Sequence, residues 1–286
     1  GNAHIGLLGS LRNIAKAKCE ITSALKADGL VGPTTYRRIW TEREASISDH
    51  RPAKNRYRSG EKSIVHNGKF KPIEWKKVVL WDEHGGLGTK SGNYYDYSGK
   101  PERKPTFFVN HWDVCLSSES CANVLKRRGA SVHFCIDNDG TIYQLLDTQH
   151  GAWHAGGQKW NQKSIGVEIS NAYYTKYQSW YEKNGLGPRP VLENSWTHGN
   201  KHKPHLGFYP IQIEAARALW KAIHIGYGIP LVCPMRDGEM LTGVSAEASK
   251  GKFEGFIHHY HLTKRKIDCA GLDLESNLQI VRQSPM

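Results

Sequence analysis

Two histidine-bearing segments far apart in the chain could supply the ligands of one metal site. His111 follows the strand-like run Phe107-Phe108-Val109-Asn110, and three histidines lie within 258–261. Between these segments, the run 164–170 is apolar except for one carboxylate, Glu168, and its terminal serines. Imidazole nitrogens from distant segments can bind zinc, and a nearby carboxylate can accept a proton from water. These residue types therefore predict a hydrolytic metal site.

Such a site needs rigid elements that bring the distant residues together. Asn138-Asp139-Gly140 separates two strand-like runs and is typical of a β-hairpin. The segment 211–227 has apolar residues at helical spacing and is predicted to be an amphipathic helix. Strands mixed with helices predict an α/β domain with a central mixed β-sheet flanked by helices. The predicted strands are 78–81, 106–110, 131–136, 141–146 and 164–170, and a shorter helix is predicted over 119–128.

Composition limits the class of protein and of partner. The chain has 286 residues, 38% hydrophobic and 23% charged, which is ordinary for a globular protein. The net charge of +12 indicates attraction to a polyanion, either nucleic acid or an anionic cell wall. Zinc-finger spacing, an RNA-binding aromatic signature and a basic heptad helix are all absent from the sequence, so we expect no nucleic-acid partner. No apolar run approaches the roughly 18 residues of a membrane span, so we expect no stable membrane insertion.

Changes in amino-acid composition along the chain predict three structural parts. Residues 1–45 are expected to form a small helical module, residues 46–72 a basic linker or an extended segment lying on the next domain, and residues 73–286 the catalytic domain. Two stretches within the last part, 175–207 and 233–254, are expected to be long loop insertions. The six cysteines are scattered without a C-x-x-C pair, and the first residues lack a signal-peptide pattern. We therefore expect synthesis in a reducing cytoplasm.

Six short motifs follow one another along the chain. They are the strand-ending His111, Ser131-Val132-His133-Phe134, Asp139-Gly140-Thr141-Ile142-Tyr143-Gln144, Trp153-His154-Ala155-Gly156, Ser164-Ile165-Gly166-Val167-Glu168 and Lys266-Ile267-Asp268. Their order resembles that of the zinc-dependent N-acetylmuramoyl-L-alanine amidases of type 2, whose fold is shared with peptidoglycan-recognition proteins. Each motif alone is weak, but six in family order are specific, and the resemblance covers roughly 75–285.

The resemblance implies three zinc ligands, which are a strand-ending histidine, a histidine near the C-terminus and an Asp or Cys after it. His111 matches the first. His258, His259 and His261 are candidates for the second, of which we choose His259. For the third, we prefer Asp268 because the family branch with a glutamate on the Ser-Ile-Gly strand pairs it with an aspartate, although Cys269 stays open.

The remaining roles also follow from the resemblance. Glu168 would act as the general base and acid, and Lys266 would stabilise the negative oxygen of the tetrahedral intermediate. Trp153 and His154 would line the groove and contact the substrate, with a packing role as the alternative for Trp153. Zinc would lower the pKa of water from 15.7 to about 7.

Three functions are compatible with this sequence. The loop Asp28–Thr35 resembles the signature of a small peptidoglycan-binding module, which with the positive charge favours a monomeric phage lysin that degrades the host cell wall. A cytosolic amidase that recycles muropeptides would not need residues 5–45. A non-catalytic peptidoglycan-recognition protein typically lacks the third ligand, whereas this chain retains Asp268, Cys269 and Glu168.

Overall fold

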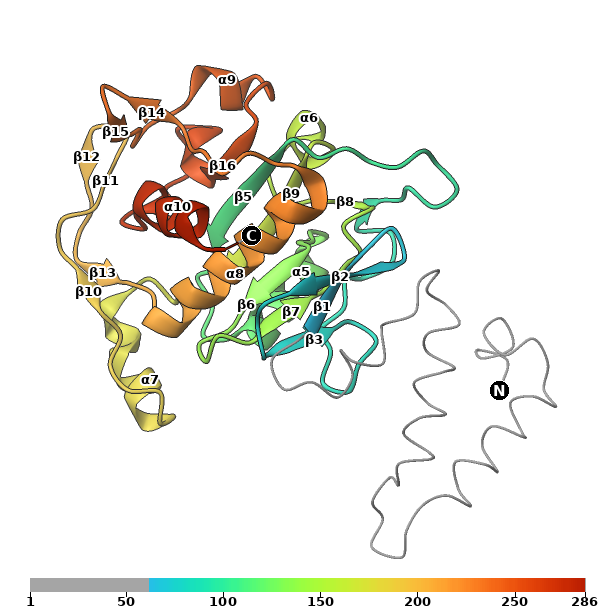
Figure 1. The fold of residues 1–286 in the computed structure, drawn as a ribbon. Helices are drawn as coiled ribbons and strands as arrows, with labels where there is room; N and C mark the ends of the chain where they lie inside the picture. The colour runs from blue at the N-terminus through green and yellow to red at the C-terminus, as the bar shows by residue number, and fades with distance from the viewer. Residues whose placement is uncertain (1–61, 286) are drawn as a thin grey trace, which may run out of the picture. The chain divides into compact units, whose positions relative to one another are not determined.

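The computed structural model describes residues 62–285, and the predicted helical module at 1–45 and the first part of the linker lie outside these residues. Of the described residues, 62–67 and 71–285 belong to one compact unit. At its centre is a six-stranded sheet with the order β16-β5-β9-β6-β7-β3 (Figure 1). The strands are β3 (Val78–Leu80), β5 (Phe107–Trp112), β6 (Phe134–Ile136), β7 (Ile142–Gln144), β9 (Ser164–Ile169) and β16 (Gly255–His258).

The sheet is mixed, as the sequence predicted. Strands β16, β5, β9 and β6 run parallel, β7 pairs antiparallel with β6, and β3 runs parallel to β7. All six residues of β5 are buried, which explains why its sequence is a nearly continuous apolar run. The predicted strand 131–136 was too long at its start, because β6 begins only at Phe134.

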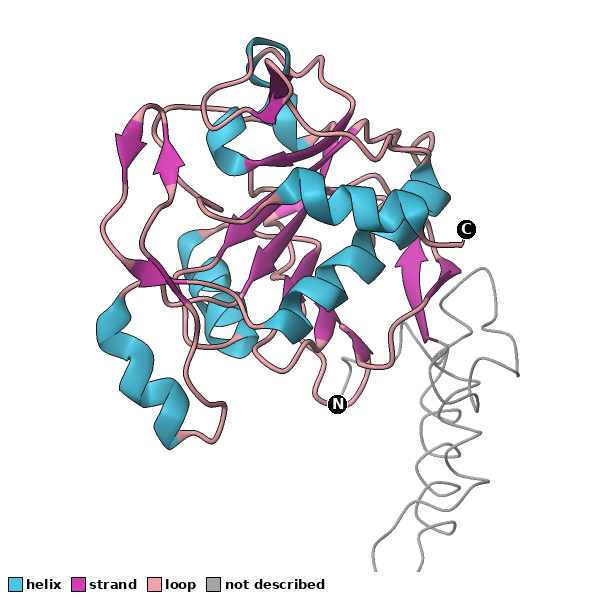
Figure 2. Cartoon of the chain, turned by 60° about the vertical axis from the view of Figure 1, so that its left-hand side comes forward, coloured by secondary structure: helices cyan, strands magenta, loops and turns pink. Residues whose placement is uncertain are grey.

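Helices cover both faces of this sheet (Figures 1 and 2). Helix α8 (Pro210–Tyr227) packs beside α10 (Leu274–Gln283), and the Trp220 indole in α8 donates to the side chain of Asn110 in β5 (2.9 Å). Helix α5 (Ser118–Arg128) packs its buried Cys121 and Ala122 against Val132 and Cys135. Because side chains alternate along a strand, Asn110 faces α8, whereas His111 faces the opposite side.

Helix α5 begins and ends where its sequence predicts. The Ser117 hydroxyl accepts from the backbone N–H of Ser120, and Gly129 closes the helix in the left-handed conformation, with φ 65°. Helix α8 has Pro210 at its first turn and Gly228 at its end. Among the described residues 62–285, no helix is both long and apolar enough to cross a membrane.

The end of the predicted linker is part of the fold. Strand β1 (Lys62–His66) has Ile64 and Val65 buried, and β2 (Lys69–Ile73) follows it. Both backbone groups of Val65 bond to the buried Gln144 amide, each at 2.7 Å. Residues 62–66 therefore belong to the fold as strand β1, in agreement with the alternative of an extended segment lying on the next domain.

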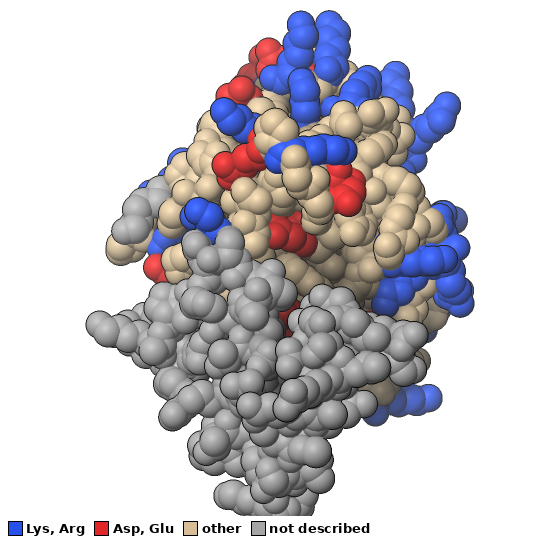
Figure 3. Space-filling model, turned by 90° about the vertical axis from the view of Figure 1, so that its right-hand side faces the viewer, with Lys and Arg blue, Asp and Glu red and all other residues tan. Residues whose placement is uncertain are grey.

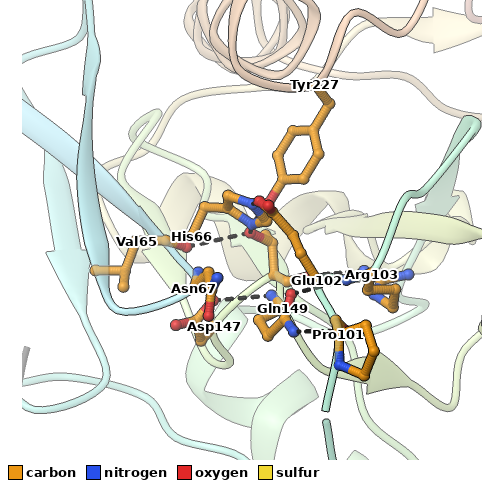
Figure 4. A network of polar contacts seen from close by, with 10 residues as sticks. Val65, His66, Asn67, Pro101, Glu102, Arg103, Asp147, Gln149 and Tyr227 are labelled. Carbon is orange, nitrogen blue, oxygen red and sulfur yellow. Dashed lines mark hydrogen bonds and ion pairs between the residues drawn. The ribbon is translucent and has the colours of Figure 1, made fainter. Parts of the chain in front are cut away.

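His66 links β1 to two other parts of the chain (Figure 4). Its Nε2 atom lies 2.6 Å from the Glu102 carboxylate, and its Nδ1 atom contacts the hydroxyl of Tyr227 at the end of α8. The Arg103 guanidinium is buried beside this network and donates to the carbonyls of Thr148 (2.7 Å) and Ser164 (2.8 Å). These contacts secure the segment that enters β5 from its amino end.

The two predicted loop insertions have secondary structure of their own, which corrects the prediction of long loops. The first contains η2 (Thr175–Tyr177), α7 (Gln178–Lys183), β10 (Val191–Leu192), β11 (Trp196–Thr197), β12 (Asn200–Lys201) and β13 (His205–Leu206). The second contains β14 (Met235–Arg236), β15 (Glu239–Met240) and α9 (Ala246–Ser249). The other short elements are β4 (Tyr94–Tyr95), β8 (Gly151–Ala152), α6 (Gln158–Asn161) and η3 (His259–His261).

Basic side chains gather at the end of the molecule that carries α6 and α9 (Figure 3). Two exposed lysines from α6 and the residues after it bond to the end of α9 and the turn that follows it. Lys159 donates to the Ser249 carbonyl (2.8 Å) and Lys163 to the Gly251 carbonyl (3.2 Å). Lys250 and Lys252 are exposed in the same segment, which gives this end of the catalytic unit a positive surface.

Candidate metal and catalytic site

The predicted site residues meet at the carboxyl ends of the parallel strands. His111 in β5 pairs in register with Glu168 in β9, so both side chains lie on the same face of the sheet. His259 follows the last residue of β16, the neighbour of β5 on its other side. The sheet thus brings together three segments that are far apart in sequence.

Three ligand-type atoms converge at this edge. Nδ1 of His111 lies 2.9 Å from Nδ1 of His259, and each of these atoms lies 3.0 Å from Oδ2 of Asp268. All three residues are buried. Ligand atoms around a tetrahedral zinc ion lie about 3.3 Å apart, so the spacing and the His-His-Asp donor set fit such an ion.

The charges within this cluster favour deprotonated ligands. Burial and the neighbouring His259 lower the pKa of His111 to about 4, so this ring is neutral at pH 7. Burial would raise the pKa of Asp268, but the two histidines hold it well below its usual range. A neutral imidazole and an ionised carboxylate are the forms that bind a metal.

The structure separates the three candidate histidines. The Cα of His258 pairs with Asn110, which places its side chain on the α8 side of the sheet, where Nε2 lies 3.0 Å from the Leu272 carbonyl. His261 bonds through Nδ1 to the His258 N–H and through Nε2 to the Leu241 carbonyl. Of the three, only His259 joins His111 and Asp268 in the cluster.

Asp268 reaches the histidines, whereas its neighbour Cys269 is not part of the cluster. The Cys269 side chain is fully buried, and burial together with the nearby Asp268 charge raises the pKa of its thiol well above the usual range. The geometry therefore favours Asp268 among the two candidates for the third position.

Glu168 and Lys266 border the same groove, a cavity of about 390 Å³ that also exposes the His-His-Asp cluster. Burial raises the pKa of Glu168 well above its usual value, with further contributions from Asp113 and Asp268. Among the described residues, the Oε2 atom of Glu168 has no hydrogen-bond partner. Lys266 is exposed at the rim. The groove thus presents a buried carboxyl oxygen and an exposed cation to a bound molecule.

Trp153 and His154 both line this groove, where the sequence placed them. His154 has a contact that sequence reasoning missed, because its Nδ1 lies 2.9 Å from Nε2 of His111. A Cβ atom on Gly166 would lie only 2.5 Å from the same His154 atom, so a glycine is required there. Trp153 packs edge-on against Tyr95, with ring centroids 5.6 Å apart.

Asp113 is a second groove residue that the sequence did not single out. Its Oδ1 accepts from the backbone N–H groups of Cys115 (2.8 Å) and Asn171 (3.0 Å), and its Oδ2 accepts from the Ser170 hydroxyl (3.0 Å). Asp113 thereby ties the loop after β5 to the loop after β9. The only feature of the sequence that could have indicated a role for Asp113 is its position two residues after the strand-ending His111.

Comparison with known proteins agrees with this geometry. The family model of the N-acetylmuramoyl-L-alanine amidases, Amidase_2, matches residues 101–268, which is more than half of the chain. The chain belongs to this amidase family. The match begins before β5, includes His111, Glu168 and His259, and ends at Asp268.

One curated relative and two solved structures illustrate the similarity. The Rickettsia conorii protein named "Putative N-acetylmuramoyl-L-alanine amidase RC0497" is 35% identical over 98 residues, which span 32% of this amidase-family chain but only 37% of the relative. The Staphylococcus aureus hydrolase AmiA, solved with its ligand, is 13% identical with a TM-score of 0.42, covering 72% of this chain and 82% of AmiA. The amidase LysC of Clostridium intestinale is 16% identical with a TM-score of 0.40, covering 72% and 97% of the two chains.

Proposed function

We propose that this chain hydrolyses the amide bond between N-acetylmuramic acid and L-alanine in peptidoglycan and that it does so with zinc. The supporting observation is the convergence of His111, His259 and Asp268 beside a buried Glu168 at one edge of the sheet. Membership of the amidase family supports the same substrate.

His111, His259 and Asp268 would hold the zinc ion through Nδ1, Nδ1 and Oδ2. Zinc bound there would supply a Lewis acid that polarises the amide carbonyl and makes water more acidic. With only three protein donors, an ion held there would still be able to bind water or the substrate from the groove, as catalytic zinc does.

The proton transfers fall to this chain's own side chains. Glu168 Oε2 would accept a proton from the attacking water and deliver it to the departing nitrogen of L-alanine. Its raised pKa suits this exchange because the carboxyl can retain the proton between the two steps. From the rim, Lys266 Nζ would donate to the carbonyl oxygen as that oxygen becomes negative.

The biological role that we propose is that of a phage lysin acting on the host cell wall, with residues 1–45 as a wall-binding module. The net charge of +12 and the basic surface near α6 and α9 support attraction to an anionic wall.

Mass spectrometry of the products from purified peptidoglycan tests the activity. We expect intact stem peptides with a free L-alanine amino group, and glycan strands whose lactyl groups end in a free carboxylate. New reducing sugar ends, or cleavage within the stem peptide, would contradict the proposal. The Glu168→Gln chain serves as the control because it retains the fold but lacks the base.

A further inference from the structure

A series of aromatic rings begins beside the groove, at the end of β5. Trp112 lines the groove at the end of β5, and its ring centroid lies 5.0 Å from that of Tyr173. Tyr173 contacts Tyr174 at 5.1 Å, and Tyr174 contacts Tyr177 at 6.5 Å. Exposure rises along this series from 6% at Trp112 to 52% at Tyr174. We call these four residues the aromatic ridge.

The ridge is held in place at a conformational cost. Tyr173 has a φ of 64°, a left-handed conformation that is unfavourable for an aromatic residue. Its N–H donates to Asn171 Oδ1 (2.8 Å), its carbonyl accepts from the Leu206 N–H (2.7 Å), and its ring stacks on His205 at 4.8 Å. Strained residues that the surrounding structure holds in place are often functional. The first insertion supplies His205 and Leu206, so the insertion fixes the ridge beside the groove.

The chemistry of the ridge favours a sugar. Aromatic faces carry negative charge density and attract the polarised C–H groups on the flat side of a pyranose ring. The segment around the exposed ring is polar, with Thr175 and Lys176 exposed, and Lys176 Nζ lies 5.4 Å from the Tyr174 ring and 5.1 Å from the Tyr177 ring. A polar surround with tyrosine hydroxyls suits a hydrated carbohydrate better than the apolar core of a protein interface.

From this geometry we infer that the aromatic ridge binds the glycan strand of peptidoglycan next to the groove. The inference rests on the proposed function for the identity of its ligand. Proximity supports this ligand, because Trp112 at the end of β5 borders the groove, where the amide would lie, and its ring contacts Tyr173 of the ridge on the α8 side of the sheet. The ridge would therefore distinguish polymeric peptidoglycan from short soluble fragments.

Binding of a β-1,4-linked N-acetylglucosamine tetramer, which contains no scissile amide, tests the ridge separately from catalysis. In a fluorescence titration of the full chain, Tyr174→Ala should weaken binding by about three- to tenfold, the scale of one aromatic contact. Tyr174→Phe retains the ring and should bind like the unmodified chain. Tyr97→Ala is the matched control, because Tyr97 also lies beside a lysine, Lys100 (5.5 Å), but in the loop that precedes β5.

Kinetics supplies the second readout. Tyr174→Ala should raise KM for intact peptidoglycan with kcat unchanged, and should leave both constants unchanged for a short soluble muropeptide. If the tetramer binds the unmodified chain and Tyr174→Ala equally, or binds neither, the inference that the aromatic ridge binds glycan is wrong. If the unmodified chain releases no peptides with a free L-alanine amino group, the proposed function fails, while the tetramer titration still reports on the ridge.

Discussion

Nε2 of His111 lies 2.9 Å from Nδ1 of His154, and this contact couples the proton positions of the two rings, because only one of the two nitrogens can donate. If Nδ1 of His111 presents its lone pair to a metal, its Nε2–H must donate to His154 Nδ1. His154 then carries its own proton on Nε2, which lies 3.1 Å from the Ser164 hydroxyl. The contacts from His111 through His154 to Ser164 can therefore accommodate the tautomer of His111 that binds zinc.

Replacement of His154 should weaken zinc binding although His154 is not a predicted ligand. Loss of a group that orients a metal-bound histidine typically costs 10–100-fold in metal affinity, and we expect about that loss in His154→Ala. His154→Asn can still accept from His111 and should bind zinc more tightly than His154→Ala. Competition with a chromogenic chelator measures both. Equal zinc affinity in all three chains would show that the contact has no orienting role.

The identity of the third ligand can be tested at adjacent positions. Asp268→Ala should lose most of its zinc, because Asp268 Oδ2 is one of the three converging atoms. Cys269→Ala should retain the metal, because its buried thiol is not part of the cluster. Elemental analysis of the purified chains gives the stoichiometry, with His111→Ala as the zinc-deficient reference. The reverse pattern would move the ligand by one position.

Glu168→Gln should keep zinc and fold but lose turnover. General acid–base catalysis contributes roughly 100-fold or more, so we expect at least that reduction in kcat, or about 2.7 kcal/mol of barrier. Glutamine has the size of glutamate but cannot accept the proton. Release of L-alanine-terminated peptides, followed by mass spectrometry, measures the rate. Near-normal turnover in a zinc-loaded variant would exclude Glu168 as the base.

Sequence reasoning located the strand-ending residues but not the contacts that depend on tertiary structure. His111 and Glu168 could be placed because each lies near the carboxyl end of a largely apolar strand. The choice among the clustered histidines needed the pairing of β16 with β5, which turns His258 toward α8 and leaves His259 for the site. The contact of His154 with His111 requires that residue 166 has no side chain, because a Cβ atom there would clash with the His154 ring. A sequence pattern does not predict this contact.

The insertions and the first strands could not be predicted for a different reason. Residues 62–72 are rich in polar residues and resemble a linker, yet Ile64 and Val65 are buried by long-range contacts that a local pattern does not show. In the first insertion, strands of two residues are too short for periodicity to be visible. The left-handed conformation of Tyr173 contradicts its residue type, so only the fold could reveal it.

Two shortened chains separate the role of the N-terminal residues from that of β1. A chain that starts at residue 73 loses the bonds from Val65 to the buried Gln144 amide, and should be less stable by at least ~1–3 kcal/mol than a chain that starts at residue 53. Urea unfolding at pH 7.5 measures the difference. Equal stability of the two chains would mean that β1 contributes nothing to the fold.

The chain that starts at residue 53 also tests the proposed wall-binding module. It should hydrolyse short soluble muropeptides like the full chain but act more slowly on intact sacculi. The defect should shrink as salt rises, because attraction between charges is screened within about 8 Å at physiological ionic strength. Equal rates on sacculi at low salt would show that residues 1–52 are not a targeting module.

The stability of the metal-free protein should fall as the pH drops below 6.5, in part because of His133. This ring is fully buried, its Nδ1 accepts from the Gly166 N–H (3.1 Å), and its Nε2 lies 3.0 Å from the His150 carbonyl. Burial, together with the nearby Arg103 guanidinium, lowers the pKa of His133 well below 6.5. The unfolded chain therefore binds a proton below pH 6.5 that the folded chain does not bind.

The sign of the effect follows from this difference in bound protons. Above pH 6.5 both states are neutral and His133 adds no pH dependence, whereas below it the free energy of unfolding falls by up to about 1.4 kcal/mol per pH unit. His133→Asn keeps an acceptor and a donor but does not titrate, so its stability should decline less steeply between pH 6.5 and 5. Urea unfolding of both metal-free chains across this range isolates the contribution, because the other histidines titrate alike in the two. Parallel pH profiles would mean that His133 becomes protonated in the folded state as readily as in the unfolded state.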